Sequence, residues 1–449
     1  MVQHELRESG LKLSLSPVQH GMLFHYIQRI NKDYLEQMIC DIIGELDITL
    51  FERTLNKLVA FHDSLRTIFL HKGVENMQQI VLPHQSIRLD FRDLSAEPDP
   101  QKYIDQCIAM DADKNFDLSV ETHRCKLFKT GKGSFVFLCT YHHLIMDSWT
   151  IRLLQDQFCE IYYHEKENVA YDLGEQYSYK LFLDWIEQQH TEHAKKYWRT
   201  YLMQYGSMQG PELPMLNTEQ ERETVNINFE RSARTIVNEI SAVYKTTVNT
   251  VILAAWGIYV LEHYQKEEIL FGCVTLGRMI GLKNVDKIAG LFVNSIPLGV
   301  SDKCTIKQLI TNVQKDIFMG AAYSYLSLSE IMACGNLRPG SICSFLNFSI
   351  DSEELDSDYA KKLPFQIRQI RYNEQSNYDV YLDVYLKTDA MTMKIYYNKQ
   401  KHYFEPNVVE NKMMQILHFM KASPQLPVKE VLNNVVLNRD MDEKAGFCF

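Results

Sequence analysis

The first half of the chain alternates between helical and strand-like spacing of its apolar residues. Apolar positions three and four apart predict helices over 50–61, 101–115 and 149–163. Ser16 followed by Pro17 is typical of a helix start, and predicts a further helix through Ile27. Segments rich in β-branched and aromatic residues predict strands over 38–46, 65–70, 78–82, 87–91, 125–129 and 135–140.

The second half repeats this mixture in a different order. One long amphipathic helix is predicted over 179–205, followed by a Gly-, Pro- and Glu-containing loop over 206–222. Further helices are predicted over 230–244, 247–263, 305–323 and 406–421, and strands over 269–275, 292–298, 343–350, 379–387 and 391–396. Strands and helices interleave irregularly, which favours an α+β fold of sandwich-like lobes over a doubly wound sheet.

The length of the chain favours more than one core. Its 449 residues exceed the usual size of a single domain. We therefore expect an N-terminal lobe over 1–175, a long helix and connection over 176–222, and a C-terminal lobe over 223–449. A hydrophobic fraction of 46% indicates that both lobes are well packed.

Charge and composition narrow the class of partner. The formal net charge of −10 and the lack of basic clusters argue against nucleic acid. The longest apolar run, over 251–261, is shorter than the roughly 20 residues that cross a bilayer, and the N-terminus lacks a signal-peptide pattern, so no membrane association is expected. The ten cysteines include no C-x-x-C pair, which is typical of buried thiols in a reducing compartment. We expect a cytoplasmic protein.

Candidate chemistry is concentrated at His142 and His143, which follow a predicted strand and precede Asp147. A neutral imidazole at a strand end, beside a carboxylate, can position a nucleophile and accept its proton near neutral pH. Either histidine could instead be structural. A metal site is also conceivable, but no third ligand follows at zinc-like spacing, so no metal is expected.

Several segments besides the His pair form an ordered series of motifs. The residues at 141–149 have the pattern His-His-x-x-x-Asp followed by Ser148, and two motifs precede them at 15–24 and 61–69. The remaining motifs lie at 179–185 with 194–198, 271–278, 290–297, 377–379 and 397–398. In this order they resemble the motifs of condensation domains of nonribosomal peptide synthetases, whose core is His-His-x-x-x-Asp-Gly, and the similarity covers nearly the whole chain.

The resemblance implies a fold and a set of partners that periodicity cannot give. Two chloramphenicol-acetyltransferase-like α/β sandwich lobes would form a V-shaped pseudo-dimer with a central tunnel, and the N-terminal lobe would carry the His pair. Donor and acceptor peptidyl carrier proteins would each bring a phosphopantetheine arm to the tunnel. The domain itself would bind no cofactor. It would be a monomer or part of a larger synthetase.

The implied reaction is attack of an acceptor amine on a carrier-bound acyl or peptidyl thioester, which forms an amide bond. His143 is expected to contact the nucleophile or the tetrahedral intermediate, while His142 packs beneath the loop. Asp147 could orient His143 as in a catalytic triad. The resemblance instead favours an ion pair of Asp147 with Arg278 that holds the loop.

Three further residues have both a functional and a structural interpretation. Arg66 is either a second charge that faces the site or a packing clamp between lobes. Asn294 lies on a segment that reaches toward the tunnel floor in relatives, or it makes an ordinary hydrogen bond at a strand end. Ser148 stands where the family usually has Gly. Its side chain would narrow the entrance or add a hydroxyl, with consequences for substrate choice, for rate or for neither.

Other functions are compatible with the same motifs. The chain begins with Met and carries no adenylation or carrier segment, so we expect either a stand-alone protein or a piece cut from an assembly line. A stand-alone or terminal enzyme that releases its product onto a soluble amine or alcohol is therefore the main alternative. A non-catalytic docking module is a second alternative, although such relatives usually lose the His pair. An acyl-CoA acetyltransferase is disfavoured, because both lobes lie on one chain and the motifs follow the condensation order.

Overall fold

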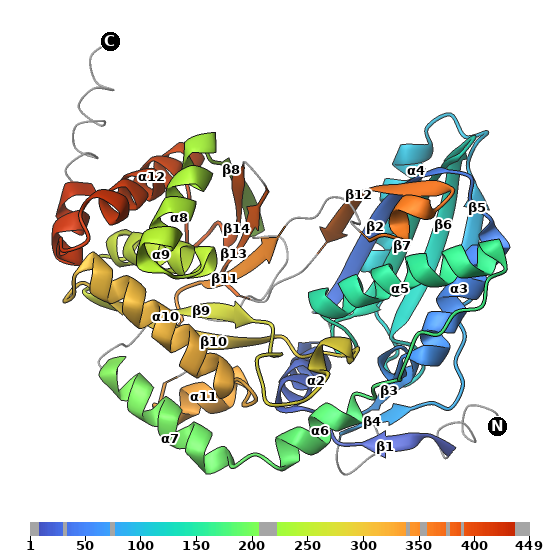
Figure 1. The fold of residues 1–449 in the computed structure, drawn as a ribbon, viewed down its shortest axis with the longest axis horizontal. Coiled ribbons are helices and arrows are strands. Elements are labelled where there is room, and N and C mark those ends of the chain that lie inside the picture. The colour runs from blue at the N-terminus through green and yellow to red at the C-terminus, as the bar shows by residue number, and fades with distance from the viewer. Residues whose placement is uncertain are drawn as a thin grey trace. The chain divides into compact units, whose positions relative to one another are not determined.

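The protein folds into two compact units, each built from segments that are distant in the sequence (Figure 1). A computed structural model describes residues 9–29, 34–71, 77–205, 222–337, 342–350, 357–373, 378–387 and 390–435. The first unit comprises Met1–Gln189, Ile280–Val293 and Ser352–Ser376. The second unit comprises His190–Met279, Asn294–Asp351 and Asn377–Phe449. Both units combine helices with a mixed sheet, so the predicted α+β class is confirmed, whereas the V and the tunnel stay predictions.

A five-stranded sheet forms the centre of the first unit. Its order is β12 (Phe365–Asn373), β2 (Leu35–Gly44), β7 (Ser134–His142), β6 (His123–Gly131) and β5 (Asp90–Asp93). The helices α3 (Ile48–Phe61) and α5 (Ser148–Glu167) pack on one face, through residues such as Phe51 and Phe158. The opposite face packs against Ile104 of α4 (Pro100–Ala112). Alternate residues of each strand therefore enter two separate cores.

Smaller elements complete the first unit. The helix α2 (Pro17–Arg29) begins at the predicted Ser-Pro start. A three-stranded sheet has the order β1 (Leu11–Leu13), β4 (Gln78–Val81) and β3 (Thr67–Leu70). The helix α6 (Lys180–Glu187) packs through Phe182 against Ile288 and Phe292, which belong to the segment Ile280–Val293. Residues from the middle of the chain thus form part of the first unit's core.

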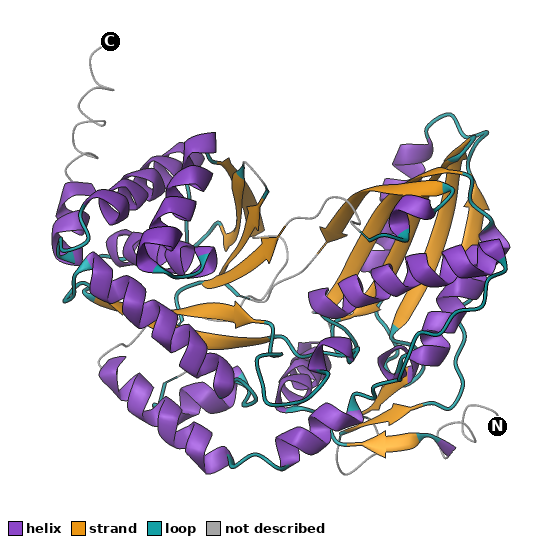
Figure 2. Cartoon of the chain, viewed as in Figure 1, coloured by secondary structure: helices purple, strands orange, loops and turns teal. Residues whose placement is uncertain are grey.

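A six-stranded sheet forms the centre of the second unit (Figure 2). Its order is β10 (Asn294–Ser301), β9 (Glu268–Thr275), β11 (Phe345–Ile350), β13 (Val380–Leu386), β14 (Met391–Asn398) and β8 (Arg222–Asn228). Its longer helices are α8 (Arg231–Tyr244), α9 (Val248–His263), α10 (Ile306–Ala322) and α12 (Pro406–Ala422). The helix α9 is apolar on all sides and buried almost throughout, as expected of a central core helix. In the part of the chain that the structure describes, no helix is long and apolar enough to span a membrane.

The long helix predicted over 179–205 is wrong, because the structure has two helices there. The helix α6 ends at Glu187, and α7 (Thr191–Leu202) begins in the other unit. His190, which precedes α7, has a non-helical backbone. Each helix buries its own apolar stripe within its own unit, Phe182 in the first and Trp198 in the second. The predicted loop over 206–222 lies outside the described residues except for Arg222, which begins β8.

Among the strands and α-helices of the described residues, four have no counterpart in the sequence-based prediction: β1, β8, β12 and α11 (Leu328–Cys334). The strand β12 is mostly polar and lies at the sheet edge, so it lacks the apolar alternation of a half-buried strand. It pairs antiparallel with β2 and places Phe365 opposite Gly44. A Cβ on Gly44 would lie 2.5 Å from the Phe365 Cα, and Gly44 has a positive φ of 134°. The pairing therefore requires glycine at this position.

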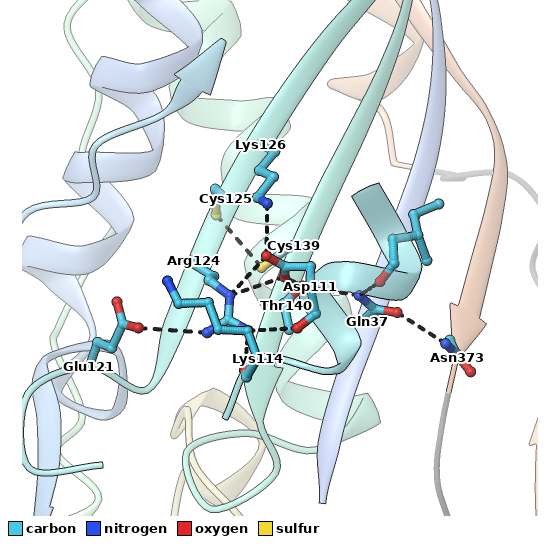
Figure 3. A network of polar contacts seen from close by, with 11 residues as sticks. Gln37, Asp111, Lys114, Glu121, Arg124, Cys125, Lys126, Cys139, Thr140 and Asn373 are labelled. Carbon is cyan, nitrogen blue, oxygen red and sulfur yellow. Dashed lines mark hydrogen bonds and ion pairs between the residues drawn. The ribbon is translucent and has the colours of Figure 1, made fainter. Parts of the chain in front are cut away.

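A buried ionic cluster joins α4 to the strands that lead to the His pair (Figure 3). The Asp111 carboxylate accepts from Arg124 Nε at 3.0 Å and pairs with Lys126 Nζ at 2.8 Å. It also accepts from the hydroxyl of Thr140 on β7, to which Gln37 Nε2 of β2 donates at 3.4 Å. Burial alone would raise the pKa of Asp111, but the hydrogen bonds from Lys126 and Thr140 and the Arg124 charge hold it below its usual value. The cluster fixes α4, β2, β6 and β7 relative to one another.

Candidate functional site

The His pair lies where β7 ends and the chain turns into α5. His142 is the last residue of β7, and Asp147 is the N-cap of α5. The three apolar residues between the His pair and Asp147, which are Leu144, Ile145 and Met146, are buried in the core of the first unit. The loop is therefore anchored by its apolar side chains and is enclosed between a strand end and a helix cap.

Asp147 is fully buried and accepts hydrogen bonds from three backbone amides. Its Oδ1 accepts from Thr150 N at 2.8 Å, which caps the first turn of α5. Its Oδ2 accepts from Phe292 N at 2.9 Å and from Val293 N at 3.3 Å. Asp147 thus joins α5 to the segment Ile280–Val293, which supports the structural interpretation. The predicted ion pair with Arg278 stays a prediction.

His143 has a defined tautomer. Its Nδ1 lies 2.7 Å from the carbonyl oxygen of Met146, and its backbone N–H donates to Tyr34 O at 2.8 Å. A carbonyl oxygen can only accept, so Nδ1 carries the proton and donates it. In the neutral imidazole, Nε2 is then the unprotonated nitrogen. Met146, and not Asp147, supplies the acceptor that orients the ring.

Glu36, which the sequence analysis did not select, lies beside the second ring nitrogen of His143. Its Oε1 is 3.6 Å from His143 Nε2, and the side chains of His143 and Glu36 are 18% and 10% exposed. Glu36 is the second residue of β2, which pairs with β7 in a register that places Glu36 opposite Tyr141. Because the two strands are about 100 residues apart in the sequence, motif spacing could not have revealed this contact.

His142 is held in a different environment from its neighbour. Its side chain is fully buried, and its ring packs edge-on against Tyr26 with centroids 5.0 Å apart. Its Nδ1 accepts from Leu144 N at 3.2 Å, so the proton of the neutral ring is on Nε2. Burial, assisted by the neighbouring His143, lowers the pKa of His142 to about 3. These contacts support the expectation that His142 shapes the loop from beneath.

Gln19 is a second residue that the sequence analysis did not select. Ser16 and Gln19 form a reciprocal cap at the start of α2, in which each backbone N–H donates to the other's side chain. The Gln19 amide also donates to Leu144 O at 3.0 Å, in the loop after the His pair. The first motif of the chain therefore supports the loop. A Ser-x-x-Gln capping box was readable from the sequence, but its second contact was not.

Ser148 is the first residue of α5 and is exposed. The backbone φ of Ser148 is not positive. The backbone here consequently does not require the glycine that the family usually has. The effect of the Ser148 hydroxyl on substrates stays a prediction.

Arg66 uses its guanidinium for contacts within the first unit. Its Nε donates to Val59 O at 3.0 Å, and one terminal nitrogen donates to Leu82 O at 2.5 Å. The other terminal nitrogen pairs with Asp63 at 2.7 Å. The side chain joins the end of α3 to the segment after β4. These contacts support the clamp interpretation, within one unit rather than between lobes.

Asn294 and Arg278 belong to the second unit. The Asn294 amide donates to Ser324 O at 2.6 Å and to Leu326 O at 2.7 Å, and its oxygen accepts from Ser295 N at 2.8 Å. It thereby joins the first residue of β10 to the segment before α11, as the strand-end interpretation expects. Arg278 is buried and follows β9.

Helical spacing predicts core positions for three tryptophans, Trp149, Trp185 and Trp198. For Trp149 this prediction is wrong. Its side chain is 40% exposed, and its indole N–H donates to Asp286 O at 2.9 Å. Trp198 is fully buried and donates to Tyr323 O at 3.1 Å. Helical spacing alone does not show which positions near a helix start face the core.

Comparison with known proteins gives one consistent answer. Gramicidin S synthase 2 of Brevibacillus brevis is 28% identical over 433 residues, which are 93% of this chain and 10% of that protein. Bacitracin synthase 3 of Bacillus licheniformis is 27% identical over 409 residues, which are 88% of this chain and 6% of that protein. The chain thus spans a tenth or less of the length of these relatives.

Solved structures agree on the fold. The first condensation domain of the calcium-dependent antibiotic synthetase superposes with a TM-score of 0.76 at 15% identity, covering 94% of this chain and 99% of that one. The condensation domain from Monacolin K polyketide synthase MokA also has a TM-score of 0.76, at 13% identity, and the match covers 94% of this chain and 100% of that one. The family described as Condensation domain matches residues 11–444. The chain therefore belongs to the condensation domain family.

Proposed function

We propose that this protein forms amide bonds in nonribosomal peptide synthesis, by transfer of an acyl or peptidyl group from a carrier-bound thioester to an acceptor amine. Condensation domains are transferases that work with phosphopantetheine held by carrier proteins. The cofactor would accordingly be brought by the partners, a donor and an acceptor carrier protein. The match along nearly the whole chain to a family of this activity supports the proposal.

The observation that carries the proposal is the fixed tautomer of His143. Since Met146 O holds the proton on Nδ1, the lone pair of Nε2 is available to the nucleophile. An α-amine has a reference pKa of about 7.7–8.0, so near neutral pH most of it must lose a proton before it can attack. A thioester is already activated, and the protein's task is to place the amine and remove that proton.

The main test is His143→Ala, assayed with a panel of acyl- and peptidyl-loaded carriers and acceptor aminoacyl carriers. Amide formation should fall by about 10²- to 10⁴-fold, the usual contribution of one general acid–base group. Product is measured by mass spectrometry. His418→Ala, at an exposed position of α12, is the matched control and should retain the full rate.

The same assay addresses the alternatives. A wild-type protein that forms product only with soluble acceptors, as an amide with a free amine or an ester with an alcohol, would be a releasing enzyme rather than an elongating one. A wild-type protein that binds carriers without making any product would be a docking module. Unchanged amide formation by His143→Ala would remove the assigned role of this residue.

A further inference from the structure

Two hydrogen-bond acceptors of the first unit lie 3.6 Å apart beside the loop. His143 Nε2 is an acceptor because its proton is held on Nδ1, and Glu36 offers a carboxylate oxygen 3.6 Å away. Neither can donate to the other in these protonation states. A group that donates to both would satisfy them together.

Among the residues that the structure describes, the only ionic contact of the Glu36 carboxylate is His143, which is a cation only when it is protonated. The Glu36 side chain is 10% exposed, and in the described part of the chain no Lys or Arg forms an ion pair with it. A carboxylate in such a position is costly unless a positive charge approaches it. At the end of β7 and in the loop after it, the other ionisable groups that the structure describes do not supply that charge. His142 stays neutral because its pKa is about 3, and the Asp147 carboxylate accepts from backbone amides.

We propose that Glu36 and His143 together bind the acceptor's amino group in its ammonium form, so that the site selects a primary amine over an alcohol. The inference rests on the proposed function and names its acceptor class. A primary ammonium has three N–H donors and a positive charge. It can donate to Glu36 Oε1 and to His143 Nε2 at the same time.

The chemical step then follows with protons accounted for. The bound R–NH₃⁺ gives one proton to His143 Nε2, and the resulting imidazolium pairs with the Glu36 carboxylate. The neutral amine attacks the thioester carbonyl carbon, and the C–N bond forms. As the C–S bond breaks, the nitrogen loses a second proton, which ends on the departing thiolate. The imidazolium finally returns its proton to water.

An alcohol would use the same site poorly. A hydroxyl has one donor and no charge, so it can donate to His143 Nε2 but leaves the carboxylate without a cation. Removing the Glu36 charge should accordingly affect amines far more than alcohols. This difference separates recognition of the amine from a general role in holding His143.

The experiment compares Glu36→Gln with the wild-type protein on two acceptors. The best aminoacyl-pantetheine from a panel is paired with its 2-hydroxy analogue, and both are offered with the same donor-loaded carrier. Glu36→Gln should lower kcat/KM for the amine by about 10- to 100-fold, the value of one charge-assisted hydrogen bond. The kcat/KM for the hydroxy analogue should change by less than about threefold, because a neutral hydroxyl makes no ionic contact with the Glu36 carboxylate. Glu45→Gln, an exposed carboxylate just after β2, is the matched control.

Each result has a defined meaning. If the wild-type protein makes no amide, the proposed function fails and this inference fails with it. If it makes amide but the amine and hydroxy rates fall equally in Glu36→Gln, Glu36 only positions His143 and the inference is overturned. Glu36→Asp keeps the charge and should keep the wild-type amine preference within about threefold. Loss of that preference in Glu36→Asp would also overturn the inference, even if Glu36→Gln failed to fold.

Discussion

At the scale of single residues, two adjacent histidines have opposite surroundings. His143 is partly exposed, whereas His142 is fully buried behind it. Because β7 ends at this point, one side chain enters the core and the other leaves it. Proximity in sequence therefore implies no similarity of role.

The burial of His142 predicts how stability depends on pH. Its folded-state pKa of about 3 lies below the ordinary value of 6.5, so only the unfolded chain takes up a proton between these values. The contribution of His142 to the free energy of unfolding should be complete well above pH 6.5 and should be lost as the pH falls from 6.5 toward 3. His142 alone contributes a loss of about 2 kcal/mol at pH 5.

Chemical unfolding at pH 7, 6 and 5 checks this dependence. His142→Asn keeps an oxygen that can accept from Leu144 N but removes the titrating ring. Its unfolding free energy should change with pH by about 2 kcal/mol less than that of the wild-type protein over this range. His84→Asn, at an exposed site, should keep the wild-type slope. Equal slopes in all three proteins would contradict the assigned pKa.

At the scale of elements, Asp147 connects the first turn of α5 to a segment almost 150 residues later in the sequence. Asp147→Asn should lower the free energy of unfolding by about 1–3 kcal/mol, because the NH₂ group of the new side chain would face the Phe292 and Val293 N–H donors. Asp147→Ala should cost more, since the cap is lost as well. Denaturant unfolding gives these values, and amide exchange at residues 292 and 293 should quicken in both variants.

Asp99 provides a matched control for this prediction. It is the N-cap of α4 and accepts from Lys102 N at 3.0 Å, but it is exposed. Asn and Asp cap helices about equally well, so Asp99→Asn should change stability by less than about 0.5 kcal/mol. Similar losses at both caps would mean that Asp147 acts only as a cap.

The sequence predicted local elements better than their connections. Helices such as α3 and α9 were readable because apolar spacing and helix starts are local signals. The family resemblance also located the His pair and Asp147. Glu36 and the strand β12 were not found, since both matter through partners that are distant in the sequence. The break between α6 and α7 was missed because both halves are amphipathic.

At the scale of the whole molecule, the first unit is discontinuous and should not survive as a simple N-terminal fragment. A fragment of residues 1–189 would lack β12 and the amides that Asp147 binds. The β2 edge would then be unpaired on one side, and unpaired edges promote aggregation. We expect this fragment to be less soluble than the full chain, with faster amide exchange in β2.

Fusing residues 352–376 to the fragment through a flexible linker tests whether the missing β12 causes the fast amide exchange in β2. The fusion supplies β12 and should slow exchange in β2 relative to the fragment alone. A fusion carrying Gly44→Ala is the matched control, because its Cβ would collide with Phe365 and prevent the pairing. Protection of β2 in the unfused fragment would show that β12 is dispensable.

The late arrival of β12 also has a consequence for synthesis on the ribosome. The main part of the first unit has been made by residue 189, but its last segment ends at residue 376, about 190 residues later. At about 5–20 residues per second, this interval lasts roughly 10 to 40 s. During that time the nascent chain must keep the β2 edge from pairing with other chains. We therefore expect its folding yield during synthesis to depend on chaperones at the ribosome more than its compact final units would indicate.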